Sequence, residues 1–316
     1  MFVLGCARSG TTLLYHMLLS AGGFAVLRSE THAFNLLEAA YGDLRVQRNK
    51  ERMLQACFDT RMFAISGLNR NEIRAKILAD CANGGDFLRI FMGQIAEKQG
   101  AQRWAECTPD HLLYISRIKE TIPDALIIHI IRDGRDVALS LDKQKWIRPL
   151  PGHGKQHLMV AALYWEWIVN RGREEGRALG QDYCELHFEQ LVADPRLVLG
   201  RVSTFIGQEL DYDRIQRVAI GSVAEPNTSF GANSAAGFNP VARWKESLTV
   251  DQLLTMEGLI GGTLQELGYN LSRAASEDSR LHQLRARYRR YFDFKFWVKT
   301  RTPIGKYLVS KDLSWL

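Results

Sequence analysis

The chain has 316 residues, of which 46% are hydrophobic, and a formal net charge of +6. That length fits one large domain with an appendage, and no stretch approaches the roughly 20 apolar residues that a membrane span requires. The five scattered cysteines include no CxxC pair, which argues against a disulfide framework and favours reduced thiols in a cytoplasmic protein. The apolar run at the N-terminus is too short for a signal peptide, and Arg8 interrupts it.

The positive charge is concentrated near the C-terminus. From Arg280 onward the chain has ten Lys and Arg residues against two Asp residues, so the residues before it carry a net charge of about −2. A basic segment of this kind indicates an anionic partner, such as phospholipid headgroups or an acidic polymer. The nearly neutral body gives no indication of nucleic-acid binding.

The N-terminal stretch predicts a loop that binds an anion. Phe2-Val3-Leu4 is typical of a short buried strand, and apolar residues follow at helical spacing from Leu13 to Leu18. The loop between them is Gly5-Cys6-Ala7-Arg8-Ser9-Gly10, followed by Thr11-Thr12. Glycines allow successive backbone N–H groups to point inward, and the start of the helix adds the positive end of its dipole.

The spacing of Gly5 and Gly10 matches a P-loop, but Thr11 stands where a nucleotide triphosphatase has Lys. We therefore expect the loop to hold an anion with its amides, the hydroxyls of Thr11 and Thr12, and the guanidinium of Arg8. It lacks the cation that a metal-bridged triphosphate needs. A plain glycine turn with a solvated Arg8 is the structural alternative.

A second short strand is predicted at Phe24–Leu27, with Arg28–His32 just beyond its carboxyl end. Ligands of open α/β sheets bind at that edge, which places Glu30 opposite whatever the first loop holds. The alternative for Glu30 is a solvated carboxylate or a helix cap. Residues 33–100 are predicted to be helical and show no catalytic motif.

Arg103–Glu106 is a candidate strand that ends at a turn, where Thr108 or Asp110 can cap the next helix. Glu106 and His111 flank this turn as secondary site candidates, and a structural role is favoured for both.

The strongest strand pattern is Ala125–Ile131, which is almost entirely apolar, as expected of a central parallel strand covered on both faces. It ends at Arg132, and a helix follows. Arg132 offers two parallel hydrogen-bond donors to a phosphate, and Ser140 adds a hydroxyl from the helix. The alternatives are a turn closed by salt bridges to Asp133 and Asp136, and a Walker-B-like strand with Asp133 as its acid.

Four features follow toward the C-terminus. A strand is predicted at Tyr183–Phe188, and Gly221–Asn239 is a candidate flap rich in Gly, Ser, Ala and Asn. Trp244, flanked by cations, either covers an aromatic base or anchors the flap. In residues 276–316, aromatic and basic residues fall at helical spacing, which is typical of a helix on a membrane surface. Packing on the body or on a second subunit is the alternative.

Together, these motifs resemble those of the sulfotransferases that use 3′-phosphoadenosine-5′-phosphosulfate (PAPS). The run Gly5–Thr12 is similar to their 5′-phosphosulfate loop, and Ile130–Ser140 is similar to their 3′-phosphate motif. Phe188–Pro195 is similar to the family's aromatic-Glu-Asp-Leu stretch, and Arg243-Trp244-Lys245 is similar to its late Arg-Trp-basic motif. The resemblance covers residues 2 to about 269, in the family's order.

The resemblance implies an α/β protein with a P-loop-like three-layer fold, in which a central parallel β-sheet is flanked by helices. It implies a sulfotransferase domain over residues 1–275 and a basic, aromatic C-terminal extension over residues 276–316. The residues implied in cofactor binding are Arg8, Ser9, Gly10, Thr11, Thr12, Arg132, Ser140, Phe188, Arg243 and Trp244.

The implied reaction is an in-line transfer of the sulfuryl group from PAPS to an acceptor hydroxyl, with adenosine 3′,5′-bisphosphate (PAP) as the product and no metal. The implied catalytic residues are Arg8, Glu30 and His32, with Glu30 as the general base and His32 and Glu106 in reserve. Arg8 stands where small-molecule branches often have Lys, and it resembles the carbohydrate and tyrosine-sulfating branches. Cys107 departs from the family's pattern and removes a cation from the acceptor side.

The expected acceptor is an alcohol on a small molecule, a glycan or a glycolipid, and the basic tail favours a glycan or glycolipid. We expect a cytoplasmic protein with a peripheral membrane contact or a homo-oligomer formed through the C-terminal extension. Two other function classes stay open. One is a P-loop kinase or nucleotide triphosphatase, which Thr11 disfavours, and the other is a non-catalytic nucleotide-binding protein at a membrane.

Overall fold

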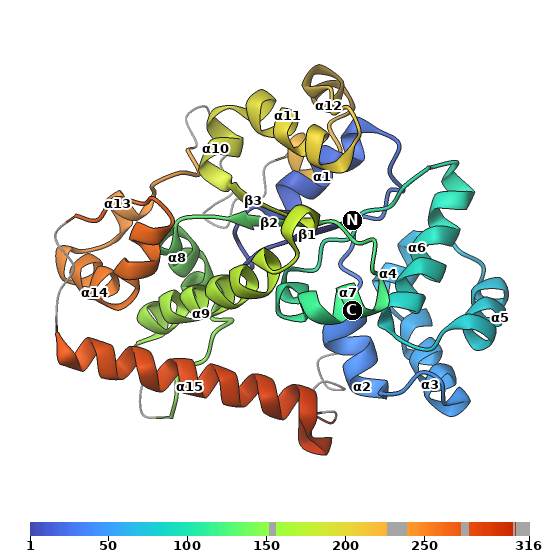
Figure 1. Cartoon of the computed structure of the whole chain (residues 1–316), viewed down its shortest axis with the longest axis horizontal. Coiled ribbons are helices and arrows are strands. Elements are labelled where there is room, and N and C mark those ends of the chain that lie inside the picture. Colours follow the sequence, from blue (N-terminus) through green and yellow to red (C-terminus); the bar gives the residue numbers. More distant parts are fainter. Residues whose placement is uncertain (152–155, 226–238, 273–277, 306, 308–316) are drawn as a thin grey trace.

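The computed structural model describes residues 1–151, 156–225, 239–272, 278–305 and 307. At its centre is a parallel sheet in the order β1–β2–β3, formed by Phe2–Leu4, Ile127–Ile131 and Tyr183–His187. The parallel pairing brings the carboxyl ends of the three strands to one edge of the sheet (Figure 1). That edge is where both predicted anion loops begin.

Two extended segments continue the sheet beyond β1. Glu106 forms a parallel bridge with Phe2, and Arg103 forms one with Phe24. The strands predicted around Phe24 and Arg103 are therefore present only as single bridges.

At the outer edge of the sheet, the backbone of Val26 pairs with a side chain instead of a further strand. Gln99 Oε1 accepts the N–H of Val26 at 2.7 Å, and Gln99 Nε2 donates to the Val26 carbonyl at 3.1 Å. Both backbone groups of Val26 are thus paired without a neighbouring strand, which explains why this strand stops short.

Helices cover both faces of the sheet (Figure 1). One face carries α1 (Thr11–Ala21), α10 (Phe188–Ala193), α11 (Pro195–Ile206), α12 (Tyr212–Val218) and η4 (Gly221–Val223). The other carries η2 (Pro109–Tyr114), α7 (Ile115–Thr121), α8 (Gly134–Gln144), α9 (His157–Arg177), α14 (Val250–Glu266) and α15 (Ser279–Arg301). Short elements are η3 (Gly180–Asp182) and α13 (Trp244–Ser247).

A further group of helices forms most of residues 33–100, as the sequence predicts, and lies beyond the outer edge of the sheet (Figure 1). It consists of η1 (Ala33–Glu38), α2 (Ala39–Tyr41), α3 (Gln47–Phe58), α4 (Arg61–Ser66), α5 (Arg70–Asp80) and α6 (Gly84–Gln99).

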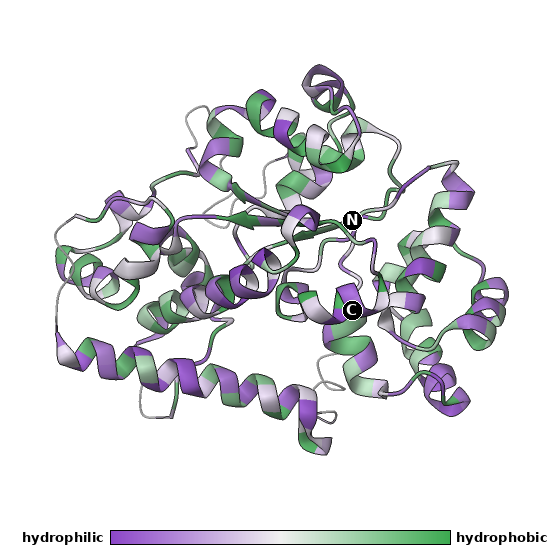
Figure 2. Ribbon diagram, in the orientation of Figure 1, coloured by the Kyte–Doolittle hydropathy of each residue, from purple (hydrophilic) through white to green (hydrophobic). Residues whose placement is uncertain are grey.

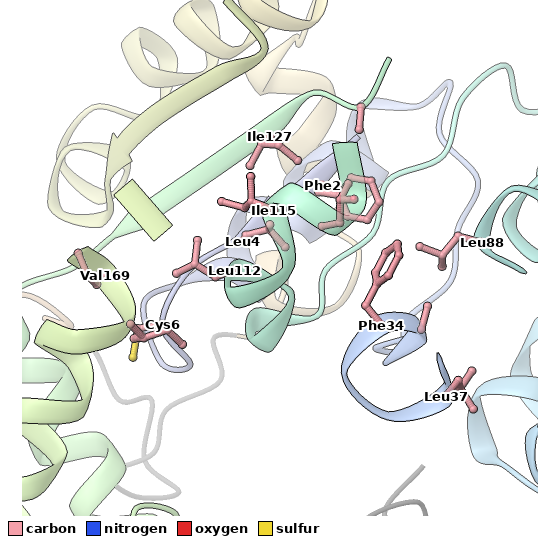
Figure 3. Packing of buried hydrophobic residues seen from close by; sticks show 14 of the residues in the cluster. Phe2, Leu4, Cys6, Phe34, Leu37, Leu88, Leu112, Ile115, Ile127 and Val169 are labelled. Carbon is pink, nitrogen blue, oxygen red and sulfur yellow. The ribbon is translucent and has the colours of Figure 1, made fainter. Parts of the chain in front are cut away.

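The side chains of β2 pack into two separate hydrophobic clusters, one on each face of the sheet. Ile127 and Ile131 join the cluster under α9, whereas Ile128 and Ile130 join the cluster under α1. All five residues of β2 are buried as a result. Figure 3 shows Ile127 in the first cluster, and Phe2 of β1 lies in it too. The predicted three-layer α/β fold with a parallel sheet is confirmed.

α15 packs along α9 and α14 with one of its faces (Figure 1). Tyr288 and Phe292 are buried, and the Trp167 indole donates to Asp293 Oδ1 at 2.8 Å. Of the alternatives for the C-terminal segment, packing on the body is observed for this helix. Among the described helices, none combines the length and apolar character that a bilayer crossing requires.

Candidate active site

The first loop, between β1 and α1, lies tightly against its neighbours. Arg8 and Gly10 have φ angles of 74° and 93°, in the left-handed region. A Cβ atom at Gly10 would lie 2.2 Å from the Phe188 ring, and one at Gly5 would lie 2.5 Å from the Ile130 carbonyl oxygen. Glycine is required at both positions, because any larger residue would push the loop away from β2 and from Phe188.

α1 begins directly at this loop. No side chain caps the helix at Gly10 in the part of the chain that the structure describes, and the Leu14 N–H donates to the Gly10 carbonyl at 3.2 Å. Thr11 is buried and Thr12 is exposed. Ser9 Oγ is buried and has no hydrogen-bond partner among the described residues. These hydroxyls and the N–H groups of the first helical turn are the donors that a bound anion would use.

The second loop brings Arg132 to the first loop. Arg132 Nη1 donates to the Arg8 carbonyl at 3.0 Å, and Nη2 donates to the Pro240 carbonyl at 2.6 Å. The guanidinium lies 4.7 Å from the centre of the Phe188 ring. Its buried Nε lacks a hydrogen-bond partner within the described ranges. An arginine that is oriented on three sides and keeps one buried donor free is suited to an anionic ligand.

Arg8 completes the junction of the two loops. Its Nε donates to Ser140 Oγ on α8 at 2.9 Å, and its guanidinium lies 5.9 Å from the centre of the Trp146 ring. Burial, followed by the charge of Arg132, lowers the pKa of Arg8, and burial also lowers the pKa of Arg132. Since each arginine is costly to keep charged here, a bound anion would stabilise both. The two loops that the sequence predicts to bind anions therefore contact each other at Arg8.

Arg135 has a different environment from Arg132. It forms ion pairs of 2.7 Å with both Asp133 and Glu257, and its guanidinium lies 3.8 Å from the centre of the Trp244 ring. The salt-bridged turn that the sequence left open therefore exists. It is built mainly by Arg135, whereas Arg132, whose Nη2 also lies 3.9 Å from Asp136 Oδ2, is directed toward the first loop.

Asp136 holds the segment that carries Arg243 and Trp244. Its carboxylate accepts the N–H of Ala242 at 2.9 Å and the N–H of Trp244 at 3.0 Å, and burial raises its pKa to about 6. Trp244 is 9% exposed, an anchoring position rather than an open aromatic platform. It lines a cavity of about 390 Å³ between α8, α13 and residues 269–272.

Glu30 and His32 form an open carboxylate–histidine pair. Glu30 Oε2 lies 3.1 Å from His32 Nε2, and the two side chains are 44% and 23% exposed. Asn35 Nδ2 lies 3.1 Å from His32 Nδ1. In the neutral ring, an acceptor at Nδ1 facing Asn35 leaves Nε2 to donate to Glu30. Burial disfavours the charged form of His32, but the hydrogen bond and charge of Glu30, with the charges of Asp110 and Glu106, raise the pKa of His32 above 6.5.

Cys107, the residue that departs from the family's pattern, is buried. Burial, followed by the charges of Glu106 and Glu30, raises the pKa of its thiol well above the ordinary value. This side chain is therefore a neutral thiol in the folded protein.

Glu106 and His111 form a second carboxylate–histidine pair, which is closed. Neither side chain is exposed, and His111 Nδ1 lies 2.9 Å from Glu106 Oε2. Glu106 Oε1 accepts from the hydroxyls of Thr31, at 2.7 Å, and Thr108. Although burial opposes it, these partners lower the pKa of Glu106 to about 2. Both carboxylate oxygens of Glu106 are buried and paired within the described residues, which favours a structural role over a reserve role as the base.

Residues 1–212 match the model of the Sulfotransferase family. The chain belongs to this family. The matched residues include both anion loops and both carboxylate–histidine pairs, whereas Arg243, Trp244 and α15 follow them in the chain. The enzyme is thus a sulfotransferase, with its matched segment ending at α12.

Solved structures agree on the fold of this sulfotransferase. The sulfotransferase domain from the Synechococcus PCC 7002 olefin synthase aligns with a TM-score of 0.54 at 20% identity, over 85% of this chain and 94% of that chain. The sulfotransferase domain from the curacin biosynthetic pathway aligns with a TM-score of 0.51 at 14% identity, over 85% of this chain and 97% of that chain. A comparison with curated protein sequences finds no match.

Sequence reasoning missed two contacts of the sulfotransferase site. Trp146 packs against Arg8, and the carbonyl of Pro240 accepts from Arg132. An isolated Trp in a polar loop just after the second anion motif could have indicated the first, but a backbone carbonyl leaves no side-chain pattern for the second. Of the predicted flap at residues 221–239, residues 226–238 lie outside the described part of the chain.

Proposed function

We propose that this sulfotransferase transfers the sulfuryl group of PAPS to a hydroxyl group of an acceptor. The observation that carries the proposal is the junction of the anion loops at Arg8, whose side chain donates to Ser140 and whose carbonyl accepts from Arg132. A donor with a 5′-phosphosulfate and a 3′-phosphate presents one anion to each loop. Thr11, in place of the P-loop lysine, argues against a nucleoside triphosphate.

Two unpaired buried donors support an anionic donor substrate. Ser9 Oγ and Arg132 Nε are both buried without partners among the described residues. Such atoms are costly unless a ligand pairs with them. We assign the 5′-phosphosulfate to the first loop and the 3′-phosphate to Arg132 and Ser140. Phe188 packs against both loops, since its ring lies beside Gly10 of the first loop and beside the guanidinium of Arg132.

In the proposed reaction the acceptor oxygen attacks sulfur in line with the bridging phosphate oxygen. The new S–O bond forms as the bond to the bridging oxygen breaks, and PAP departs with that electron pair. The acceptor proton moves to Glu30, which is accessible and is oriented by His32. Arg8 and the loop N–H groups stabilise the charge on the bridging and sulfuryl oxygens. The base is worth roughly 10²–10⁴-fold in rate.

For the acceptor we favour a hydroxyl of a glycan or glycolipid. Trp146 is 55% exposed and packs against Arg8, the residue nearest the transferred group in this assignment. An exposed indole face offers an apolar surface for the C–H face of a sugar ring while its N–H stays in water. The same face could discriminate between acceptors without touching the donor.

Calorimetric titration of the full chain with PAP, and separately with ATP and Mg²⁺, tests the donor assignment. We expect metal-independent PAP binding that weakens roughly 10- to 100-fold in Arg132→Ala, since charge-assisted hydrogen bonds are lost. The control is Arg217→Ala, an exposed arginine on α12. Binding of ATP with Mg²⁺ in place of PAP would favour the kinase class, and PAP binding without turnover on any acceptor would favour a non-catalytic protein.

A further inference from the structure

The outward face of α15 presents a continuous stripe of basic and aromatic residues. Arg287, Arg290, Phe294, Trp297 and Arg301 follow one another at alternating steps of three and four, so they lie on one side of the helix. All five are exposed, with Phe294 at 61% and Trp297 at 54%. We call these five residues the α15 outer face. Figure 2 shows hydrophilic and apolar residues interleaved along the whole helix.

The two aromatic residues of this face are exposed, although other aromatic residues of the same helix are buried against the body. The Phe294 and Trp297 rings stack on each other with centroids 6.1 Å apart. Their neighbours Tyr288 and Phe292, in contrast, are buried against the body. Ile304, just beyond the helix, is 66% exposed and extends the apolar surface. Large exposed apolar groups gathered in this way are typical of an interaction surface.

The charge of the outer face is unbalanced. Within the described ranges, Arg287, Arg290 and Arg301 have no carboxylate partner, and the face carries no acid. The acid nearest to it in sequence, Asp293, is turned toward the body, where it accepts from Trp167 and lies 3.5 Å from Arg171. Three unpaired cations beside two exposed rings match the chemistry of an anionic lipid surface.

The inner face of α15 joins this helix to the body and to the loop that carries Trp146 and Leu150. Arg285 Nε donates to Glu166 Oε2 at 2.7 Å, and the Leu150 N–H donates to the Tyr288 hydroxyl at 3.2 Å. Leu150 belongs to the same loop as Trp146, which packs against Arg8. A surface that docks on α15 would therefore lie on the side of the molecule to which the Trp146 loop is attached.

We propose that the α15 outer face docks peripherally on a bilayer that contains anionic lipids, with the arginines on the headgroups and the Phe294 and Trp297 rings inserted at the interface. This inference goes beyond the proposed reaction and does not depend on the donor. A second copy of the chain is a poorer occupant, because a two-fold contact through this face would bring arginines of like charge together.

The test is co-sedimentation of the full chain with vesicles of phosphatidylcholine alone and with vesicles that also contain phosphatidylserine. We expect binding to the anionic vesicles only, weakened by salt. Each arginine contributes roughly fivefold, so the triple variant R287Q/R290Q/R301Q should lose on the order of 100-fold. The double variant F294S/W297S should also lose binding, through lost insertion.

The matched control is R48Q/R61Q/R217Q, which removes three exposed arginines elsewhere and changes the net charge equally. It should bind vesicles like the wild type. Equal losses in both triple variants, or no binding by the wild type, would overturn the proposal. So would a dimer in sedimentation analysis that only the α15 variants abolish. Vesicle binding needs no donor, so failure of PAP binding would leave this result intact.

Discussion

The two carboxylate–histidine pairs have similar geometry and opposite exposure. Glu30 and His32 lie 3.1 Å apart and remain open to solvent, while Glu106 and His111 lie 2.9 Å apart and are fully buried. Thr31 joins them, since its hydroxyl donates to Glu106 and it stands between Glu30 and His32 in the chain. The closed pair holds the segment on which the open pair is displayed. A short distance between acid and base is therefore not enough to choose a candidate base; the exposure of the carboxylate oxygens distinguishes the two pairs.

The largest expected effect tests the open pair. Glu30→Gln should lower turnover roughly 10²–10⁴-fold, because the amide cannot accept the acceptor's proton. The affinity for PAP should stay at its wild-type value, since in this assignment the Glu30 side chain, which is 44% exposed, holds no part of the donor. Steady-state kinetics beside calorimetry measures this, and normal turnover of the variant would refute the assignment of the base.

The next effect tests the closed pair. Glu106→Ala should lower the free energy of unfolding by roughly 3–5 kcal/mol, because it leaves a buried histidine and two hydroxyls without their common partner. Urea denaturation measures the loss. Glu106→Gln is the matched variant, since it keeps an acceptor and should lose less. A Glu106→Ala protein as stable as the wild type would show that the cluster does not hold the fold.

Acid should act on the closed pair in the same direction. The pKa of Glu106 is about 2 in the folded protein, below its ordinary value of 4.5. Such a group stabilises the fold above pH 4.5, and that contribution is lost as the pH falls toward 2, by about 3 kcal/mol. Denaturation at a series of pH values should show a steeper acid loss in the wild type than in Glu106→Gln. Parallel curves would contradict this assignment.

The smallest effect concerns His32. Its pKa is raised above 6.5 by Glu30 against the effect of burial, so Glu30→Gln should bring it down. The stability that this charged pair contributes is present below pH 6.5 and is lost as the pH rises through the folded pKa. Titration of the His32 ring by NMR in both proteins follows the shift directly. An unchanged His32 pKa in Glu30→Gln would show that the two side chains do not interact in solution.

Much of the candidate donor site can be located from the chain alone. The first loop, Arg132 and Ser140 are recognisable because each follows an apolar strand and precedes a helix, and parallel strands must place such loops at one edge. The fold class follows from the same logic, since a strand as apolar as β2 has to be covered on both faces. These are local patterns, and a local pattern can be recognised without knowing which distant residues it contacts.

The residues alone predict two loops at the carboxyl ends of parallel strands, the parallel sheet itself, and a basic, amphipathic C-terminal segment. The partners of Arg132 and Arg135, and the different exposure of Glu30 and Glu106, are visible only in the folded chain. The reason is that partners far along the chain set these environments. Glu257 forms an ion pair with Arg135, and the hydroxyl of Thr31 donates a hydrogen bond to Glu106. The burial of a side chain, or its pairing with a residue so far away along the chain, cannot be read from the local sequence around it.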